Sequence, residues 1–325
     1  MSITDSHGRA FSYLRLSITD QCNFRCQYCL PDGYQKTGAK GFLTQDEIVR
    51  LAKGVTDLGI WKIRLTGGEP TVRTDFADIA AALSQIEGVK CLATTTNGYS
   101  LARYAQKWHA TGITRLNVSI DSLHADKFHR ITGHDKLRDV LNGLEQAQHA
   151  GIPTIKINTV LMRGVNDDEF GAFLDWARRE ALSLRFIELM QTGDNAAFFK
   201  ERHVSMDTFQ ARLEQEGWSL QERQEGAGPA SVYAHPNYRG TIGLIAPYSK
   251  DFCSSCNRLR VTARGDLRLC LFGEFSHPLR DLLQSDQQME ELQARICGLL
   301  PIKKPSHNLH DGATGLTPHL ASLGG

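Results

Sequence analysis

The chain has 325 residues, of which 41% are hydrophobic, and a formal net charge of +1. This length and composition predict a globular protein with one large domain or two ordinary ones. The near-neutral charge gives no general reason to expect binding to nucleic acid or to a membrane surface, so any attraction for anions must come from locally placed basic residues. No apolar run is long enough to span a bilayer. We therefore expect a cytoplasmic protein whose eight cysteines serve metal binding or reactivity rather than disulfides.

Six apolar runs alternate with helical patterns in the first 190 residues or so. The runs are 13–19, 60–65, 89–94, 116–120, 155–161 and 184–189. Thr44 and Glu47 form a capping-box signature for one intervening helix, and Asp167 and Asp168 complement the dipole at the start of another. Strands that alternate with helices predict an α/β fold with a parallel sheet, here an incomplete (β/α)6 TIM-type barrel.

Three cysteines follow the first apolar run with the spacing C-x3-C-x2-C: Cys22, Cys26 and Cys29. Thiolates of this kind select zinc, copper(I) or iron-sulfur clusters. A structural zinc site is normally closed by four protein ligands, whereas three ligands leave one metal position open to a small molecule. We favour an iron-sulfur cluster with an open iron. A zinc loop completed by a distant histidine is the alternative.

Polar segments lie at the ends of the predicted strands, where barrel proteins place their chemistry. They are 66–70, 95–98, 117–121 and 188–190. In the first of them, Gly67 and Gly68 permit close approach of the backbone to a ligand and leave amides free to bind it. A glycine pair alone more often marks a simple turn.

The cysteine loop, with an aromatic residue before its last cysteine, resembles the cluster loop of the radical S-adenosylmethionine (SAM) superfamily. The resemblance implies a 4Fe-4S cluster on the three cysteines, SAM bound at the open iron, and cleavage of SAM to a 5′-deoxyadenosyl radical. The segment 66–70 resembles the superfamily's motif for the methionine part of SAM. The cofactor-binding residues implied in this way are Gly68 and Glu69, with Tyr28, Ser119 and Met190 around the adenosine.

Five cations interrupt the apolar runs: Arg15, Lys62, Arg64, Lys156 and Arg185. Burial of an isolated cation is costly unless the cation is paired. For any one of them, exposure at a strand edge or pairing with a carboxylate such as Glu188 is an equally good explanation. Five together predict an electropositive pocket for a polyanion at the barrel mouth, and arginine in particular suits phosphate.

Residues 221–231 have the composition of a linker. We therefore predict a boundary near residue 225, between a partial-barrel domain at 1–225 and a smaller α+β cap domain at 226–325. The segments 231–234 and 241–246 are predicted strands of this cap.

The predicted cap contains a second cysteine trio, Cys253, Cys256 and Cys270, which again leaves one metal position open. Zinc is a serious alternative here, because His277 is near enough in sequence to be a fourth ligand. Arg258 and Arg260 beside the trio favour a second iron-sulfur site, at which a base binds the open iron while the arginines meet phosphates or the base. The remaining cysteines, Cys91 and Cys297, are predicted to be buried.

This arrangement resembles the MoaA family of GTP 3′,8-cyclases, which begin molybdenum cofactor synthesis. The likeness covers nearly the whole chain, through 14–17, the cysteine loop, 64–70, 185–188, 251–253 and the terminal Gly324–Gly325. It implies that the adenosyl radical takes a hydrogen from C3′ of GTP and that C3′ then adds to guanine C8. Reduction gives 3′,8-cyclo-7,8-dihydro-GTP.

The same resemblance implies two 4Fe-4S clusters, the second of which is ligated by the guanine. It places Arg258, Arg260 and the tail residues Gly324 and Gly325 in the catalytic machinery, and Leu320 to Leu323 are expected to anchor that tail. The implied GTP-binding residues are Arg15, Arg64, Thr95, Lys156, Arg258, Leu259 and Arg260. From their positions on the predicted strands, we add Lys62 and Arg185 as triphosphate contacts.

The expected partners are GTP, a reductant or electron-donor protein, and a downstream cyclic pyranopterin monophosphate synthase. Nucleic acid and membranes are not expected as partners, and the chain is expected to be a monomer or a homodimer. Two alternatives stay open on the sequence. One is a radical SAM maturase that modifies a peptide and carries an auxiliary cluster; the other is a non-enzymatic zinc protein that binds nucleotides.

Overall fold

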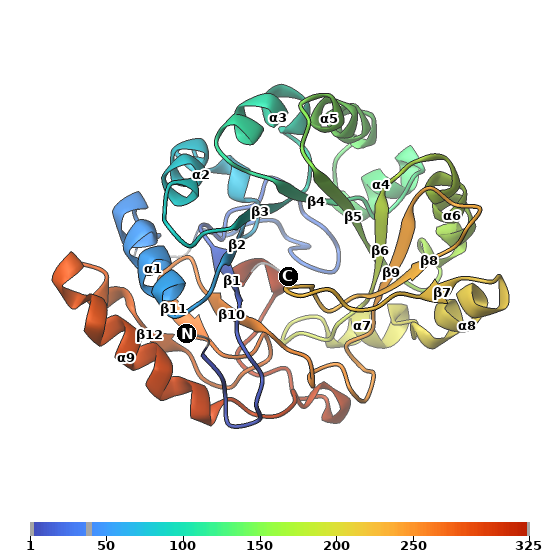
Figure 1. Ribbon diagram of the computed structural model, residues 1–325. Helices are drawn as coiled ribbons and strands as arrows, with labels where there is room; N and C mark the ends of the chain where they lie inside the picture. The colour runs from blue at the N-terminus through green and yellow to red at the C-terminus, as the bar shows by residue number, and fades with distance from the viewer. Residues whose placement is uncertain (1–2, 37–40, 324–325) are drawn as a thin grey trace.

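A single curved sheet organises the computed structural model, which describes residues 3–36 and 41–323. Within these residues the sheet has 12 strands in the order β12-β11-β10-β1-β2-β3-β4-β5-β6-β9-β8-β7. Every neighbouring pair from β10 to β9 is parallel, and the pairs at the two ends are antiparallel. Figure 1 shows the parallel strands as an arc with the helices on its outer side.

The first six strands and the helices between them match the predicted alternation. The strands are β1 (Tyr13–Ser17), β2 (Lys62–Thr66), β3 (Cys91–Thr96), β4 (Arg115–Ser119), β5 (Thr154–Leu161) and β6 (Ser183–Glu188). The helices are α1 (Gln45–Asp57), α2 (Phe76–Ser84), α3 (Leu101–Ala110), α4 (Ala125–Thr132), α5 (Leu137–His149) and α6 (Phe170–Arg179). The partial-barrel fold class is confirmed.

The rest of the chain adds short strands, three helices and several single turns of 3-10 helix within the described residues. The longer elements are α7 (Ala196–Arg202), α8 (Asp207–Gln215), β7 (Ser219–Leu220), β8 (Ser231–Ala234), β9 (Thr241–Ile245), β10 (Arg258–Val261), β11 (Asp266–Arg268), β12 (His277–Pro278) and α9 (Met289–Leu299). The 3-10 turns of the described residues, the first two of which lie between strands of the barrel, are Pro70–Val72, Asp167–Glu169, Arg280–Leu282, Asp286–Gln288, Leu300–Ile302, Leu309–Asp311 and Leu320–Ser322.

Alternation along the strands divides the arc into an outer and an inner face. On β1, Leu14 and Leu16 are fully buried in the main core, together with Ile48 and Leu51 of α1. Because side chains two residues apart share a face of a strand, Arg15 lies on the opposite, inner face of β1. The hydrophobic core therefore lies between the sheet and the helices, and polar side chains line the inside of the arc.

The predicted separate cap is not confirmed, because residues beyond 225 extend the barrel sheet at both edges. β9 pairs in parallel with β6, and β10 pairs in parallel with β1. The predicted linker is also attached to its surroundings. Lys62 Nζ donates to Gly226 O at 2.8 Å, and Arg223 Nη2 donates to Ser255 O at 2.9 Å. The domain boundary near residue 225 stays a prediction.

One of the two single cysteines departs from the prediction. Cys91 is buried on β3, but Cys297 on α9 is exposed. Helix α9 lies beside α1 (Figure 1) and buries Leu292 and Ile296, with Leu292 against Gly54 of α1. Since neighbouring helix positions point about 100° apart, Ile296 can face the protein while Cys297 faces solvent.

The predicted capping box at the start of α1 is present and continues into an ion pair with the C-terminal region. Thr44 Oγ1 accepts from Glu47 N at 3.2 Å, and Glu47 Oε2 accepts from Thr44 N at 2.8 Å. Arg280 Nε donates to Glu47 Oε1 at 2.8 Å. Burial opposes ionisation of this carboxyl group, but its hydrogen bonds outweigh burial and lower the pKa of Glu47 to about 2.

We expect Glu47→Gln to lower the free energy of unfolding by about 2 kcal/mol, because a charged acceptor for Arg280 is lost while the side-chain shape is kept. Guanidinium denaturation followed by circular dichroism measures the change. Glu290→Gln on exposed α9 is the matched control. Equal unfolding midpoints for the two variants would show that the Glu47–Arg280 pair contributes nothing to stability.

Candidate active site

The first cysteine trio lies in the loop that leaves the carboxyl end of β1. Cys29 N donates to Cys26 O at 2.9 Å, which forms a turn. Arg25 N donates to Thr132 O at 3.1 Å and Gln27 N to Ile131 O at 3.0 Å, so the end of α4 holds the loop by its main chain. Main-chain hydrogen bonds therefore position the loop that carries the three thiols.

The surroundings of these thiols suit a bound cation. Burial raises the pKa of Cys22 to about 11 and that of Cys29 to about 12. Burial also raises the pKa of Cys26, and the charge of Asp121 and the neighbouring thiols add to the effect. Metal ligation requires deprotonated thiols. A bound metal would supply the positive charge that stabilises the three thiolates. The residues present therefore fit a 4Fe-4S cluster.

The glycine pair after β2 packs against the cysteine loop. Cβ atoms at Gly67 and Gly68 would overlap main-chain oxygens of Thr19, Asp20 and Gln21. Gly68 N donates to Thr19 O at 3.0 Å, so the expectation of a free amide is wrong at this position. The two glycines are therefore required for close packing, but the group that packs against them is the protein's own backbone and not a ligand. Binding of SAM by Gly68 stays a prediction.

Glu69 is 1% exposed, and the protein occupies both of its carboxylate oxygens. Oε1 accepts from Thr71 Oγ1 at 2.6 Å and from Thr96 Oγ1 at 2.8 Å, and Oε2 accepts from Asn97 N at 2.6 Å. Burial raises the pKa of Glu69 despite these bonds. Glu69 therefore links the ends of β2 and β3 beside Cys22, and its contact with SAM stays a prediction.

The other predicted SAM residues also lie at the carboxyl ends of the strands. Tyr28 Oη donates to Asp121 Oδ2 at 2.9 Å, and Asp121 Oδ1 accepts from Val160 N at 2.8 Å. Burial raises the pKa of Asp121 to about 6. Ser119 is the half-buried last residue of β4. Met190 packs in an apolar cluster that also contacts Cys29. Asp121 was not predicted as a site residue.

The predicted cations of β1, β2 and β10 form two adjacent rows on the inner face. Arg15 lies in register between Arg260 and Arg64. Two residues earlier, Tyr13 lies in register between Arg258 and Lys62. Like charges directly opposite one another in a sheet are destabilising. The two rows therefore favour a bound anion.

The remaining predicted cations join these rows electrostatically. Burial and the charges of Arg185, Arg64, Lys62 and Arg115 together lower the pKa of Lys156 to about 7. Arg115, the first residue of β4, was not predicted. Its charge acts on Lys62, Lys156 and Arg185 alike, which places it in the same cluster. Only its position at the start of a strand could have indicated it.

In the described part of the chain, most of this positive charge has no carboxylate counter-ion. Within 3–36 and 41–323, Lys62, Arg64, Lys156, Arg185, Arg258 and Arg260 form no ion pair with a carboxylate. Glu188, the carboxylate suggested above as a possible partner for a strand cation, pairs with His203 Nε2 at 2.7 Å instead. Among the residues that the structure describes, Arg185 Nε, Arg258 Nη1 and Arg260 Nε are buried without a hydrogen bond. Unsatisfied buried donors of this kind suit a polyanionic ligand.

Thr95 and Leu259, two of the predicted GTP-binding residues, direct their side chains to opposite faces of the sheet. Thr95 Oγ1 accepts from Arg64 Nη1 at 3.4 Å, so it belongs to the inner face. Leu259 lies in register with Leu14 and is buried in the main core, so its side chain faces the helices. Any substrate contact from Leu259 must therefore come from its main chain.

The second cysteine trio lies at the amino end of β10, whereas the first lies at the carboxyl end of the parallel neighbour β1. The cation rows lie between them. Cys256 N donates to Cys253 O at 3.1 Å, and Arg9 Nη1 also donates to Cys253 O, at 3.1 Å. Burial opposes ionisation of Cys256, but Arg258, Lys303 and Arg260 outweigh it and lower its pKa to about 6.

A fourth ligand for zinc is not evident at the second trio. His277 lies on β12, in register with Leu267, and its ring centroid is 6.5 Å from that of Phe275. Among the residues that the structure describes, no three His, Cys, Asp or Glu side chains are grouped to hold a single metal ion. A 4Fe-4S cluster distributes its thiolates over separate irons.

The C-terminal segment docks beside the first trio, as predicted for its apolar residues. Leu320 and Leu323 are buried in a cluster with Leu271 and Phe272, and this cluster also contacts Cys29 and Cys270. The predicted catalytic residues Gly324 and Gly325 lie outside the described residues. Leu320 and Leu323, which were predicted to anchor them, lie next to both cysteine sites.

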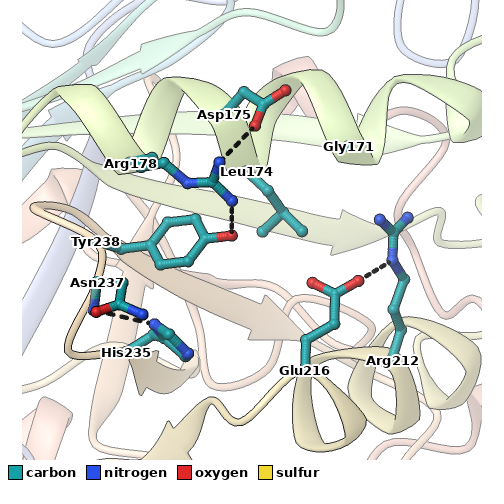
Figure 2. Close-up of a pocket in the computed structure, with 9 residues that line it drawn as sticks. All are labelled: Gly171, Leu174, Asp175, Arg178, Arg212, Glu216, His235, Asn237 and Tyr238. Carbon is teal, nitrogen blue, oxygen red and sulfur yellow. Dashed lines mark hydrogen bonds and ion pairs between the residues drawn. The ribbon is translucent and has the colours of Figure 1, made fainter.

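A separate surface groove of about 570 Å³ lies between α6, α8 and the turn before β9. Figure 2 shows that its cations have partners: Arg178 contacts Asp175 and Tyr238, and Arg212 contacts Glu216. None of the predicted site residues lines this groove. The buried cation rows, and not the groove, are therefore the candidate site.

No helix in the described part of the chain is long and apolar enough to cross a bilayer.

Comparison with known proteins agrees with this geometry. Residues 16–177 match the family model "Radical SAM superfamily", and residues 182–309 match "Molybdenum Cofactor Synthesis C". The crystal structure of Streptococcus suis SuiB bound to S-adenosylmethionine shares the fold, with a TM-score of 0.59 and 12% identity over 89% of this chain and 69% of that one. The chain is a radical SAM protein.

Full-length relatives define the family more narrowly. A protein of Stenotrophomonas maltophilia named GTP 3′,8-cyclase is 54% identical over 323 residues, which are 99% of each chain. A protein of Yersinia pestis with the same name is 52% identical over 325 residues, which are 100% of each chain. The chain belongs to the GTP 3′,8-cyclase family. This membership displaces the peptide-modifying and zinc-protein alternatives.

Proposed function

We propose that the chain converts GTP into 3′,8-cyclo-7,8-dihydro-GTP, the first step of molybdenum cofactor biosynthesis. The observation that carries this proposal is the pair of cation rows between two cysteine trios, with Arg15 between Arg260 and Arg64. When bound, a 4Fe-4S cluster on Cys22, Cys26 and Cys29, together with SAM, supplies the radical that accepts the C3′ hydrogen. Gly68, Glu69, Tyr28, Ser119 and Met190 form the SAM site.

The substrate site in this proposal is the inner face of the arc. Arg15, Lys62, Arg64, Lys156 and Arg185 bind the triphosphate, because their positive charges lie close enough on the inner face to act on one another. Thr95 completes the site beside Arg64. Arginine suits phosphate because its donors are fixed in a planar fork. Burial of these cations also keeps water from the phosphates and strengthens each contact.

The guanine end of the substrate lies toward the second trio. Cys253, Cys256 and Cys270 hold a second 4Fe-4S cluster, and Arg258, the Leu259 main chain and Arg260 bind and orient the nucleotide next to it. The positive charges of Arg258, Lys303 and Arg260 act directly on Cys256. Gly324 and Gly325 are proposed to reach the site from the docked Leu320–Leu323 segment.

The chemistry of the reaction defines the partners. Removal of the C3′ hydrogen atom leaves a carbon radical, and its bond to C8 leaves an unpaired electron on the base. One electron and one proton then complete the dihydro product, so a reductant or electron-donor protein is required. A cyclic pyranopterin monophosphate synthase is the proposed consumer of the product.

Anaerobic reconstitution with iron and sulfide, followed by incubation with SAM, GTP and dithionite as reductant, tests the proposal. We expect a product with the mass of GTP, and transfer of deuterium from C3′-labelled GTP into 5′-deoxyadenosine. SAM cleavage that is indifferent to GTP, or label that stays on the ribose, would contradict it.

Lys156→Ala separates triphosphate recognition from nucleoside recognition. We expect the variant to bind GTP about 10- to 100-fold more weakly, because a charge-assisted hydrogen bond to phosphate is lost, and to bind guanosine as the wild type does. Equilibrium binding under anaerobic conditions measures both ligands. Lys107→Ala on the exposed side of α3 is the control. Equal losses for GTP and guanosine would refute phosphate binding by Lys156.

A further inference from the structure

Tyr13 is the one side chain in the two cation rows that can carry a negative charge. It lies in register between Arg258 on β10 and Lys62 on β2, and it shares the inner face of β1 with Arg15. Its side chain is 3% exposed. A buried phenol at this position is therefore surrounded by cations from β10, from β2 and from its own strand β1.

The phenol contacts both cations of β2. Arg64 Nε donates to Tyr13 Oη at 2.5 Å, and Lys62 Nζ lies 4.6 Å from the centroid of the Tyr13 ring. Arg64 Nη1 donates in turn to Thr94 O at 2.9 Å and to Thr95 Oγ1 at 3.4 Å. Two nitrogens of the guanidinium are thus held by the protein. Among the described residues, Nη2 forms no hydrogen bond and can meet a ligand oxygen.

We propose that Tyr13 is a positioning residue for substrate binding, which holds Arg64 so that its Nη2 donates to the triphosphate. This inference rests on the proposed function of the site. An arginine fork is selective for phosphate only when its plane is fixed, and here Tyr13 Oη and Thr94 O fix two sides of that plane. Tyr13 acts through Arg64 and does not itself contact the reacting atoms.

The same contacts make Tyr13 a charge partner for the site before GTP binds. Burial opposes ionisation of the phenol, but Arg64, Arg15 and Lys62 outweigh it and lower the pKa of Tyr13 to about 7. Arg185 on β6 and Arg260 on β10 also interact with its charge. A bound triphosphate adds negative charge beside these cations and disfavours the phenolate. Binding then moves a proton from solvent to Tyr13 Oη.

Tyr13→Phe tests this role, because it removes the acceptor oxygen and keeps the ring under Lys62. We expect GTP and inorganic tripolyphosphate to bind about 10-fold more weakly to the reconstituted variant, because the lost hydrogen bond is that of the charged Arg64. Binding of guanosine is expected to be unchanged. Calorimetry near pH 7 in buffers of different ionisation enthalpy is expected to show fewer protons taken up per GTP bound than in the wild type.

Tyr233→Phe on β8 is the matched control, because Tyr233 is also 3% exposed and lies outside the cation rows. Iron content and circular dichroism establish that each variant is folded. If Tyr13→Phe matches the wild type in tripolyphosphate affinity and in proton uptake while Lys156→Ala loses affinity, the role of Tyr13 is refuted and phosphate recognition stands. If the wild type binds neither GTP nor tripolyphosphate, the proposed function fails, and this inference fails with it.

Discussion

Cys26→Ala is expected to reduce SAM cleavage to the background rate. Cys26 is the middle cysteine of the first trio, and its main-chain oxygen accepts the bond from Cys29 N that forms the loop's turn. Loss of its thiol removes one of the three proposed cluster ligands and leaves the turn intact. The measurement is 5′-deoxyadenosine formed per chain with dithionite as reductant, together with the iron content of the reconstituted protein.

Cys91→Ala is the matched control for this experiment, because Cys91 is also a poorly exposed thiol but lies at the start of β3, outside both trios. It is expected to keep wild-type iron content and SAM cleavage. Radical formation at the wild-type rate in Cys26→Ala would refute the assignment of the first site. A loss of activity in both variants would point to general destabilisation.

Most of the barrel could be predicted from the sequence because its signals are local. The Thr44–Glu47 capping box depends on residues three apart, and each of the first six strands lies in one short, mainly apolar run. The place of β9 and β10 could not be predicted in this way. Their pairing with β6 and β1 joins segments far apart in sequence, and short strands do not encode their neighbours.

Some residues of the candidate site could likewise be predicted from the sequence, and others could not. The cysteines and strand cations stand out because their residue types are unusual in those positions. Tyr13 does not, since an aromatic residue at the start of a strand is ordinary and its role depends on Arg64 and Lys62 of the next strand. Asp121 was likewise missed, because its link to Tyr28 spans 93 positions of the sequence.

Cys256→Ala is expected to separate the two halves of the reaction. The first trio lies at the other end of the parallel strands, so its cluster and reductive SAM cleavage are expected to persist. The cyclised product is expected to be absent, because the second cluster loses a ligand and GTP is no longer presented to the radical. Iron content is expected to fall from that of two clusters to that of one.

Cys297→Ala, an exposed thiol on α9, is the control for this variant and is expected to behave as the wild type. The contrast is informative because the cations proposed to bind the triphosphate all remain in Cys256→Ala. GTP is therefore expected to bind with reduced affinity and without turnover, which a purely structural collapse would not produce. Unchanged formation of the product in Cys256→Ala would instead make the second trio a structural feature, with substrate orientation left to the cation rows alone.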